Sequence, residues 1–308
     1  MRWTEADIPS QKGRSVIITG ANSGLGYHTS MALARRGARV IMVCRNLDKG
    51  EAARQRILDK HPEVETELWE LDLSDLESVH TFAERYLATH GGPDLLINNA
   101  GLMAIPYLNT RDGFEMQFGV NHLGHFALTA LLWQGMFDKS GARIVNISSI
   151  AHHFGKIRFE DIHWEQGYQK WGAYGMSKLS NLLFTSELAR KLSESGSDVL
   201  VVAAHPGYAD TSLQAKGMLM AGSSRKAGFY TLANRIVAQS GEMGALPSLY
   251  AATQPGVEQG AFYGPSGFLK LKGWPTVERP NPRRVRADVA EQLWSLSEDL
   301  TGISFPAS

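Results

Sequence analysis

Two residues in the stretch YGMSK have types and spacing that could carry acid–base chemistry. Tyr174 and Lys178 are four positions apart, and positions i and i+4 lie on one face of an α-helix. A neighbouring ammonium favours the phenolate, which brings a tyrosine closer to acid–base use near neutral pH. The alternative is a tyrosine and a lysine that share an exposed helix face and do no chemistry. The rest of the sequence has to distinguish these interpretations.

Small and polar residues gather where three later apolar runs end. Ligands of parallel α/β sheets bind outside the carboxyl ends of the strands, so residues there are candidates for a site. Ser149 ends one of these runs and is expected to face the crevice. The three stretches are NNAG (98–101), NISS (146–149) and AHPG (204–207).

Asn121 stands inside the apolar, helix-like stretch FGVNHLGHF. Asparagine is unfavourable in a helix interior and needs a polar partner when it is buried. His122 and His125 flank it and are interpreted as packing or supporting groups. No carboxylate–histidine spacing near His152 and His153 suggests a metal site, and the single cysteine, Cys44, excludes an intramolecular disulfide or a cysteine-based metal site.

A glycine-rich turn, TGANSGLG, follows the first apolar run. Gly20, Gly24 and Gly26 have GxxxGxG spacing between an expected strand and an expected helix. Glycines let the backbone turn tightly and approach a pyrophosphate, while the helix N-terminus offers free N–H groups and a positive dipole end. The alternative is an ordinary tight loop, but this location favours phosphate binding.

The end of the second apolar run favours NADP(H) over NAD(H). An acidic residue at this position accepts a hydrogen bond from the ribose 2′-OH, whereas an arginine accommodates a 2′-phosphate. Here Cys44 stands in the acidic position and Arg45 follows it. Because Arg45 is next to the glycine turn, we interpret it as a phosphate contact rather than a solvated charge.

The alternation of apolar runs with helical patterns predicts the fold that positions these residues. The runs are continuous rather than alternating, which is typical of strands buried on both faces. The expectation is therefore α/β: a Rossmann-like, doubly wound parallel sheet with helices on both faces, in a single domain over residues 1–308. Ser74 and Glu77 have capping-box spacing at the start of a helix. The chain becomes less regular from about Tyr208, with a substrate lid at about 208–235, a C-terminal extension at about 255–308 and a closing helix in 286–302.

The composition limits the classes of partner. The chain has 308 residues, and its 31 Lys and Arg balance its 31 Asp and Glu. No overall field therefore recruits nucleic acid or an anionic membrane. No stretch of about 18 apolar residues suggests a membrane span, and the start lacks the apolar core of a signal peptide. A soluble, cytoplasmic protein is expected.

Taken together, these motifs resemble the short-chain dehydrogenase/reductase family. TGANSGLG, NNAG, NHLGH, ISS, YGMSK and HPG occur in the order and spacing of that family, from Gly20 to Gly207. CRN, NHLGHF and SSIAHHFGKI are similar to the retinol-dehydrogenase-like reductases, and the two ends of the chain resemble soluble bacterial members. Light-dependent protochlorophyllide reductases are a more distant resemblance.

The resemblance implies roles for the matching residues. Tyr174 would exchange the proton at the substrate oxygen, and Lys178 would bind the nicotinamide ribose and lower the tyrosine pKa. Ser149 would position the carbonyl, while Asn121 would complete a proton relay to solvent through water and Lys178. The implied cofactor-binding residues are Gly20, Asn22, Ser23, Gly24, Leu25, Gly26, Arg45, Asp72, Leu73, Asn98, Ala100, Gly101, Tyr174, Lys178, Pro206, Gly207 and Thr211.

The expected function is NADP(H)-dependent hydride transfer to or from an apolar carbonyl or alcohol. Leucine and methionine in the Gly/Ser-rich stretch after HPG suit a lid for apolar ligands, although an ordinary amphipathic helix is the alternative. Two other functions stay open: C=C reduction of the protochlorophyllide reductase type, and a non-catalytic NADP-binding regulatory protein. Many family members pair through the helices that carry NHLGH and YGMSK, so a homo-oligomer is one expectation. Trp164, Tyr168 and Trp171 either pack in a surface loop or wall the substrate cleft.

Overall fold

One mixed sheet runs through the computed structural model, which describes residues 2–137, 139–208 and 239–305. Its strands lie in the order β3-β2-β1-β4-β5-β6-β7-β8. β1 to β7 pair in parallel, and β8 is antiparallel to β7. The strands are β1 (Ser15–Thr19), β2 (Arg39–Cys44), β3 (Thr66–Glu70), β4 (Leu95–Asn98), β5 (Arg143–Ile147), β6 (Leu200–Ala204), β7 (Phe262–Pro265) and β8 (Pro275–Glu278).

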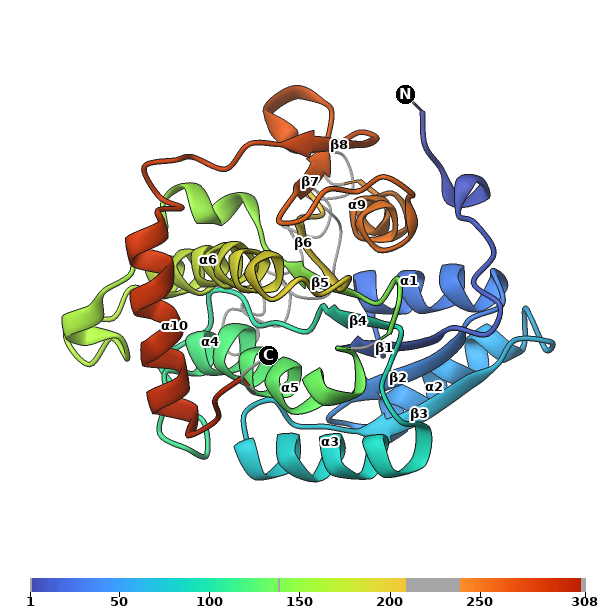
Figure 1. Cartoon of the computed structure of the whole chain (residues 1–308), viewed down its shortest axis with the longest axis horizontal. Coiled ribbons are helices and arrows are strands. Elements are labelled where there is room, and N and C mark those ends of the chain that lie inside the picture. The colour runs from blue at the N-terminus through green and yellow to red at the C-terminus, as the bar shows by residue number, and fades with distance from the viewer. Residues whose placement is uncertain (1, 138, 209–238, 306–308) are drawn as a thin grey trace, which may run out of the picture.

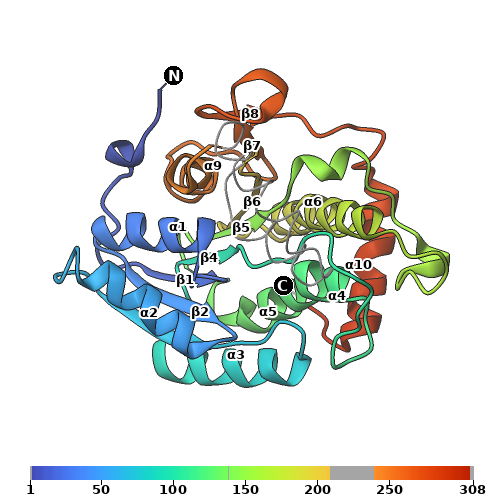
Figure 2. The ribbon, with the colours of Figure 1, turned by 180° about the vertical axis from the view of Figure 1, so that it is seen from behind.

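Helices cover both faces of this sheet (Figures 1 and 2). Along β1 the side chains alternate: Val16 and Ile18 pack in the core layer under α1, α2 and α9, whereas Ile17 packs under α3, α5 and α6. The doubly wound α/β prediction is therefore confirmed, and the buried strands have the expected continuous apolar runs. The helices are α1 (Gly24–Arg35), α2 (Leu47–Leu58), α3 (Leu76–His90), α4 (Met116–Phe118), α5 (Gly124–Leu132), α6 (Lys170–Ser195), α9 (Gly241–Thr253) and α10 (Ala287–Thr301).

The start of α3 differs from the capping-box prediction. Asp75, not Ser74, is the N-cap, and its carboxylate accepts the Glu77 N–H at 3.1 Å. The Ser74 hydroxyl donates instead to Asp72 Oδ1 at 2.6 Å. The prediction failed because a carboxylate two residues upstream competes for the serine hydroxyl.

The C-terminal part is more regular than the sequence suggests. β7 and β8 extend the sheet, and α9 packs beside α1. Each of these strands has only four residues, and glycine and proline within them weaken the sequence signal for a strand. The closing helix is confirmed as α10, which packs against α6. The lid predicted at about 208–235 lies outside the described residues apart from Tyr208.

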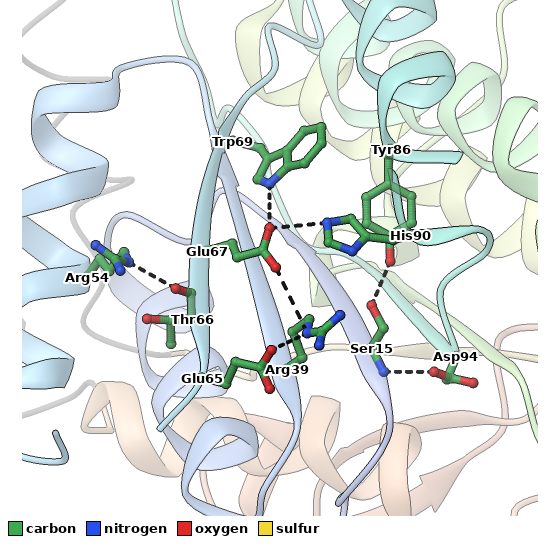
Figure 3. Close-up of polar contacts among 10 residues, drawn as sticks. All are labelled: Ser15, Arg39, Arg54, Glu65, Thr66, Glu67, Trp69, Tyr86, His90 and Asp94. Carbon is green, nitrogen blue, oxygen red and sulfur yellow. Dashed lines mark hydrogen bonds and ion pairs between the residues drawn. The ribbon is translucent and has the colours of Figure 1, made fainter. Parts of the chain in front are cut away.

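The β3 edge of the sheet is charged (Figure 3). The Glu67 carboxylate accepts the Trp69 indole N–H at 3.0 Å and pairs with His90 Nε2 at 3.2 Å. Arg39 on β2 pairs with both Glu65 and Glu67. Charged side chains on an edge strand discourage pairing with the strand of another chain. Within the described ranges, no helix is both long and apolar enough to cross a membrane.

Candidate active site

A cavity of about 840 Å³ lies at the carboxyl ends of the parallel strands, where the sequence predicts the site. Two of the predicted residues, Asn98 and Asn121, do not border it, and Thr211 lies outside the described residues. The predicted residues that line it are Gly20, Asn22, Ser23, Gly24, Leu25, Gly26, Arg45, Asp72, Leu73, Ala100, Gly101, Ser149, Tyr174, Lys178, Pro206 and Gly207.

The glycine turn forms one end of the cavity. Gly20 has φ 68°, in the left-handed region that favours glycine. A Cβ on Gly26 would collide with the Gly20 carbonyl oxygen and with Asn99 Nδ2. Ser23 is the N-cap of α1 but makes no side-chain capping hydrogen bond. The first turn of α1 therefore keeps N–H donors at the cavity, an arrangement that suits a phosphate group.

Arg45 lies at the rim of this end, directly after β2. Its side chain is 64% exposed, and Nη1 is 3.6 Å from Asp72 Oδ2. Because exposed ion pairs of this kind are weak, Asp72 does not prevent the guanidinium from turning toward an anion. Lys49 in the first turn of α2 also borders the cavity, although no motif in the sequence points to it. Two cations, Arg45 and Lys49, thus border this end of the cavity.

Tyr174 and Lys178 lie on α6 as the YGMSK spacing predicts. Both side chains are buried, and Lys178 Nζ is 6.0 Å from the centre of the Tyr174 ring. The ammonium donates to the Ile147 carbonyl oxygen at 3.0 Å. Burial lowers the pKa of Lys178 to about 8. Because both side chains are buried, the alternative of an exposed tyrosine–lysine pair on a helix surface does not apply.

The pKa of Tyr174 differs from the expectation that Lys178 lowers it. Burial raises the pKa of Tyr174 to about 12, and only a hydrogen bond with the Ser149 side chain opposes this. The Lys178 ammonium lies 6.0 Å from the ring centre and bonds to Ile147, and desolvation of the phenolate sets the direction of the shift. A neutral phenol at the cavity wall is a proton donor at pH 7.

Ser148 and Ser149 have different surroundings although they are adjacent. The Ser148 hydroxyl is buried and donates to the Lys178 carbonyl oxygen at 2.8 Å. Ser149 is half-buried, and its oxygen accepts the Ala151 N–H at 3.2 Å while its side chain also bonds Tyr174. Ser149 is thus hydrogen-bonded to Tyr174 at the cavity wall, whereas Ser148 joins the end of β5 to α6.

Asn121 lies in a π-helical turn, Gly119–Leu123, between α4 and α5. Its amide group donates to Ser177 Oγ at 2.8 Å and to the Leu102 carbonyl oxygen at 2.9 Å, while Oδ1 accepts the Leu102 N–H at 2.7 Å. A Cβ on Gly101 would lie 3.1 Å from Asn121 Oδ1 and 3.3 Å from Lys178 Nζ. The side chain therefore joins the segment after β4 to α6 beneath the cavity, and the proton relay stays a prediction.

The two asparagines of NNAG have different surroundings. Asn98 is buried in the sheet, where its amide group donates to Thr129 Oγ1 at 3.0 Å and Asn146 Oδ1 at 2.8 Å. Asn99 lines the cavity, and its Nδ2 donates to the Thr19 carbonyl oxygen at 2.7 Å. Thr19 also lines the cavity. The cofactor role predicted for Asn98 stays untested.

The aromatic residues before Tyr174 separate into two groups. Trp171 is 51% exposed and borders the cavity together with Phe154, which is 54% exposed. Trp164 is buried in the core, and Tyr168 OH donates to the Ile105 carbonyl oxygen at 3.0 Å. The sequence left open whether these three aromatic residues line the cleft. Trp171 lines the cavity, whereas Trp164 and Tyr168 pack in the core cluster behind it. Leu102, Met103, Ile105 and Ile150 add aliphatic surface to the cavity.

No metal site accompanies this arrangement in the part of the chain that the structure describes. No three His, Cys, Asp or Glu side chains are grouped there to hold an ion. The cavity brings together a glycine cradle, cations at one end, and a Tyr–Lys–Ser group beside an apolar wall.

Comparisons with known proteins agree with this geometry. The chain matches the family described as short chain dehydrogenase over residues 14–220. It is 41% identical over 307 residues to Retinol dehydrogenase 12 of Mus musculus, covering 98% of this chain and 90% of that protein. A crystal structure of an uncharacterized protein from Mycobacterium paratuberculosis has a TM-score of 0.82 and 44% identity, covering 100% of both chains. A structure described as an NAD(P)-dependent gluconate 5-dehydrogenase from Beutenbergia cavernae, with bound NADP, has a TM-score of 0.62 and 26% identity, covering 82% of this chain and 95% of that one.

Proposed function

Because this chain belongs to the short-chain dehydrogenase family, we propose that it transfers hydride between NADP(H) and an apolar carbonyl or alcohol, with Tyr174 as general acid and base. At the coarser level it is a pyridine-nucleotide-dependent oxidoreductase of the retinol-dehydrogenase-like group, acting on CH–OH or C=O groups. Neither C=C reduction nor a regulatory role receives support from the relatives named above.

The observation that carries the proposal is the group formed by buried Tyr174 and Lys178 and half-buried Ser149 at the wall of the cavity. When bound, the nicotinamide supplies or accepts the hydride. The Ser149 hydroxyl would donate to the substrate oxygen and hold it beside the Tyr174 phenol. Tyr174 would then give its proton to that oxygen during reduction and remove it during oxidation. The Lys178 ammonium would bind ribose hydroxyls with the donors that Ile147 does not use.

The apolar lining supports an apolar substrate. Trp171 and Phe154 stand at the cavity with the aliphatic side chains named above, and such surface favours ligands with little charge. Retinol, which gives the mouse relative its name, is an alcohol with a long apolar chain. Transfer of this substrate class to the present chain is part of the proposal.

Turnover of a carbonyl panel tests the function. The purified protein would be mixed with NADPH or NADH and straight-chain aldehydes of rising length, and loss of reduced nicotinamide would be followed by absorbance. We expect rates with NADPH that rise with chain length. Rates that fall steadily as the aldehyde grows would overturn the apolar substrate. The absence of turnover across aldehydes, ketones and alcohols would overturn the hydride-transfer proposal.

Arg45→Ala is expected to weaken NADP(H) about tenfold while leaving NAD(H) within about twofold. The reason is loss of a charge-assisted contact to the 2′-phosphate, which NAD(H) lacks. Dissociation constants for both cofactors, measured by calorimetry, check this. Arg54→Ala is a matched control. Arg54 lies in α2, which follows Arg45, but it does not line the cavity and instead bonds Glu51 and the Thr66 carbonyl oxygen. Equal constants for NADPH and NADH in the unmutated protein would contradict the proposed preference.

A further inference from the structure

His125 is a buried titratable residue that the proposed mechanism does not use. It lies on α5, and both ring nitrogens have partners. Nε2 is 2.8 Å from Thr19 Oγ1, and Nδ1 is 3.1 Å from the Asn121 carbonyl oxygen. Thr19 ends β1 at the glycine turn, and Asn121 belongs to the turn beneath Lys178. One imidazole thus contacts both the end of β1 and the turn that contains Asn121.

The partners of Thr19 fix the tautomer of this imidazole. The Thr19 hydroxyl oxygen accepts the N–H groups of Asn99 and Ala100, each at 2.9 Å. These two bonds occupy its lone pairs, so its own proton is donated. His125 Nε2 at 2.8 Å is a better acceptor than the Ile97 carbonyl oxygen at 3.4 Å. Nε2 therefore accepts, and Nδ1–H donates to the Asn121 carbonyl oxygen.

The protonation state agrees with this assignment. Burial lowers the pKa of His125 to about 3, and the nearby Lys178 charge acts in the same direction. The ring is therefore neutral at every pH at which the enzyme would work. The backbone N–H groups of Asn99 and Ala100 already occupy the lone pairs of Thr19 Oγ1. The imidazole therefore cannot pass a proton to the Thr19 oxygen.

We propose that His125 is a positioning residue that ties the cofactor-side ends of β1 and β4 to the Asn121 turn. Through Thr19 it holds Asn99 and Ala100, which line the cavity. Through the Asn121 carbonyl it steadies the turn whose side chain bonds Ser177, the residue before Lys178. Cofactor binding and turnover then depend on two different halves of one ring. This inference rests on the proposed function.

His122, three residues before His125, offers a matched control. It is as deeply buried as His125, and burial lowers its pKa to about 3 as well. Its Nε2 shares a hydrogen bond of 2.9 Å with Ser297 Oγ on α10, and it does not line the cavity. Replacing either histidine costs packing, but only His125 contacts the site.

The experiment compares His125→Asn, His125→Gln, His122→Asn and His122→Gln. An asparagine amide can replace the Nδ1–H donor but does not reach Thr19, whereas the longer glutamine can accept from Thr19. We expect His125→Asn to raise the NADPH dissociation constant about fivefold, as for loss of one neutral hydrogen bond. His125→Gln is expected to keep that constant within about twofold and to lower kcat about fivefold. The His122 variants should lower the midpoint of thermal unfolding similarly, with kcat and the dissociation constant unchanged.

Binding and turnover separate the two ways in which the inference can fail. If the unmutated protein binds neither NADPH nor NADH, the proposed function is wrong and this inference falls with it. If the unmutated protein binds and turns over, but the His125 variants match the His122 variants in both constants, only the positioning role is overturned. Should His125→Asn not fold, His125→Gln against His122→Gln decides the question through kcat alone.

Discussion

Tyr174→Phe is expected to lower kcat by about 10²- to 10⁴-fold, the usual contribution of a positioned general acid. The ring and its packing stay, so only the phenol hydroxyl and its hydrogen bond with Ser149 are removed from the wall of the cavity. Stopped-flow or steady-state loss of reduced nicotinamide gives kcat, and calorimetry gives the NADPH dissociation constant. The latter should stay within about twofold, because the phenol is proposed to act on the substrate oxygen.

The control for this variant is Tyr168→Phe. Tyr168 precedes the same helix and has a half-buried hydroxyl, but that hydroxyl bonds Ile105 and Glu115 instead of facing the cavity. We expect only a small loss of kcat from Tyr168→Phe. Near-wild-type turnover by Tyr174→Phe would show that another group supplies the proton, and the assigned mechanism would be abandoned.

Lys178→Met is expected to weaken NADPH binding by about 10- to 100-fold and to lower kcat. The lost interactions are charge-assisted hydrogen bonds to ribose, each stronger than a neutral bond. The same change should not lower the midpoint of thermal unfolding, because it removes a buried ammonium whose desolvation is unfavourable. A stable variant with weak binding would identify Lys178 as a residue kept for function. A variant that binds NADPH as tightly as the unmutated protein would refute the ribose contact.

The pH profile of carbonyl reduction is expected to fall on the alkaline side. Burial lowers the pKa of Lys178 to about 8 and raises that of Tyr174 to about 12, so the lysine loses its proton first as pH rises. Below pH 8 both groups carry the protons that reduction needs. We expect kcat/KM to decline above about pH 8 and Lys178→Met to lack this limb. An unchanged alkaline limb in that variant would assign it to another group.

The sequence by itself determined the features that depend on neighbours along the chain. Tyr174 and Lys178 share a helix face because the helix repeats every 3.6 residues. The glycine turn can be predicted from the sequence because only glycine tolerates its positive φ and its close backbone contacts. The continuous apolar runs likewise predicted strands buried between helices. Short-range sterics and periodicity are sufficient for each of these predictions.

Only the tertiary structure decided which polar residue of a motif meets the cavity. Asn98 turns into the sheet toward Thr129 and Asn146, while Asn99 reaches the cavity. His122 and His125 look alike in sequence, yet one contacts α10 and the other the end of β1. The short strands β7 and β8 joined the sheet in a region that the sequence left irregular. In each case the interacting partners come from segments that are distant in the sequence, so local propensity does not predict the arrangement. The need of buried polar groups for hydrogen-bond partners determines it instead.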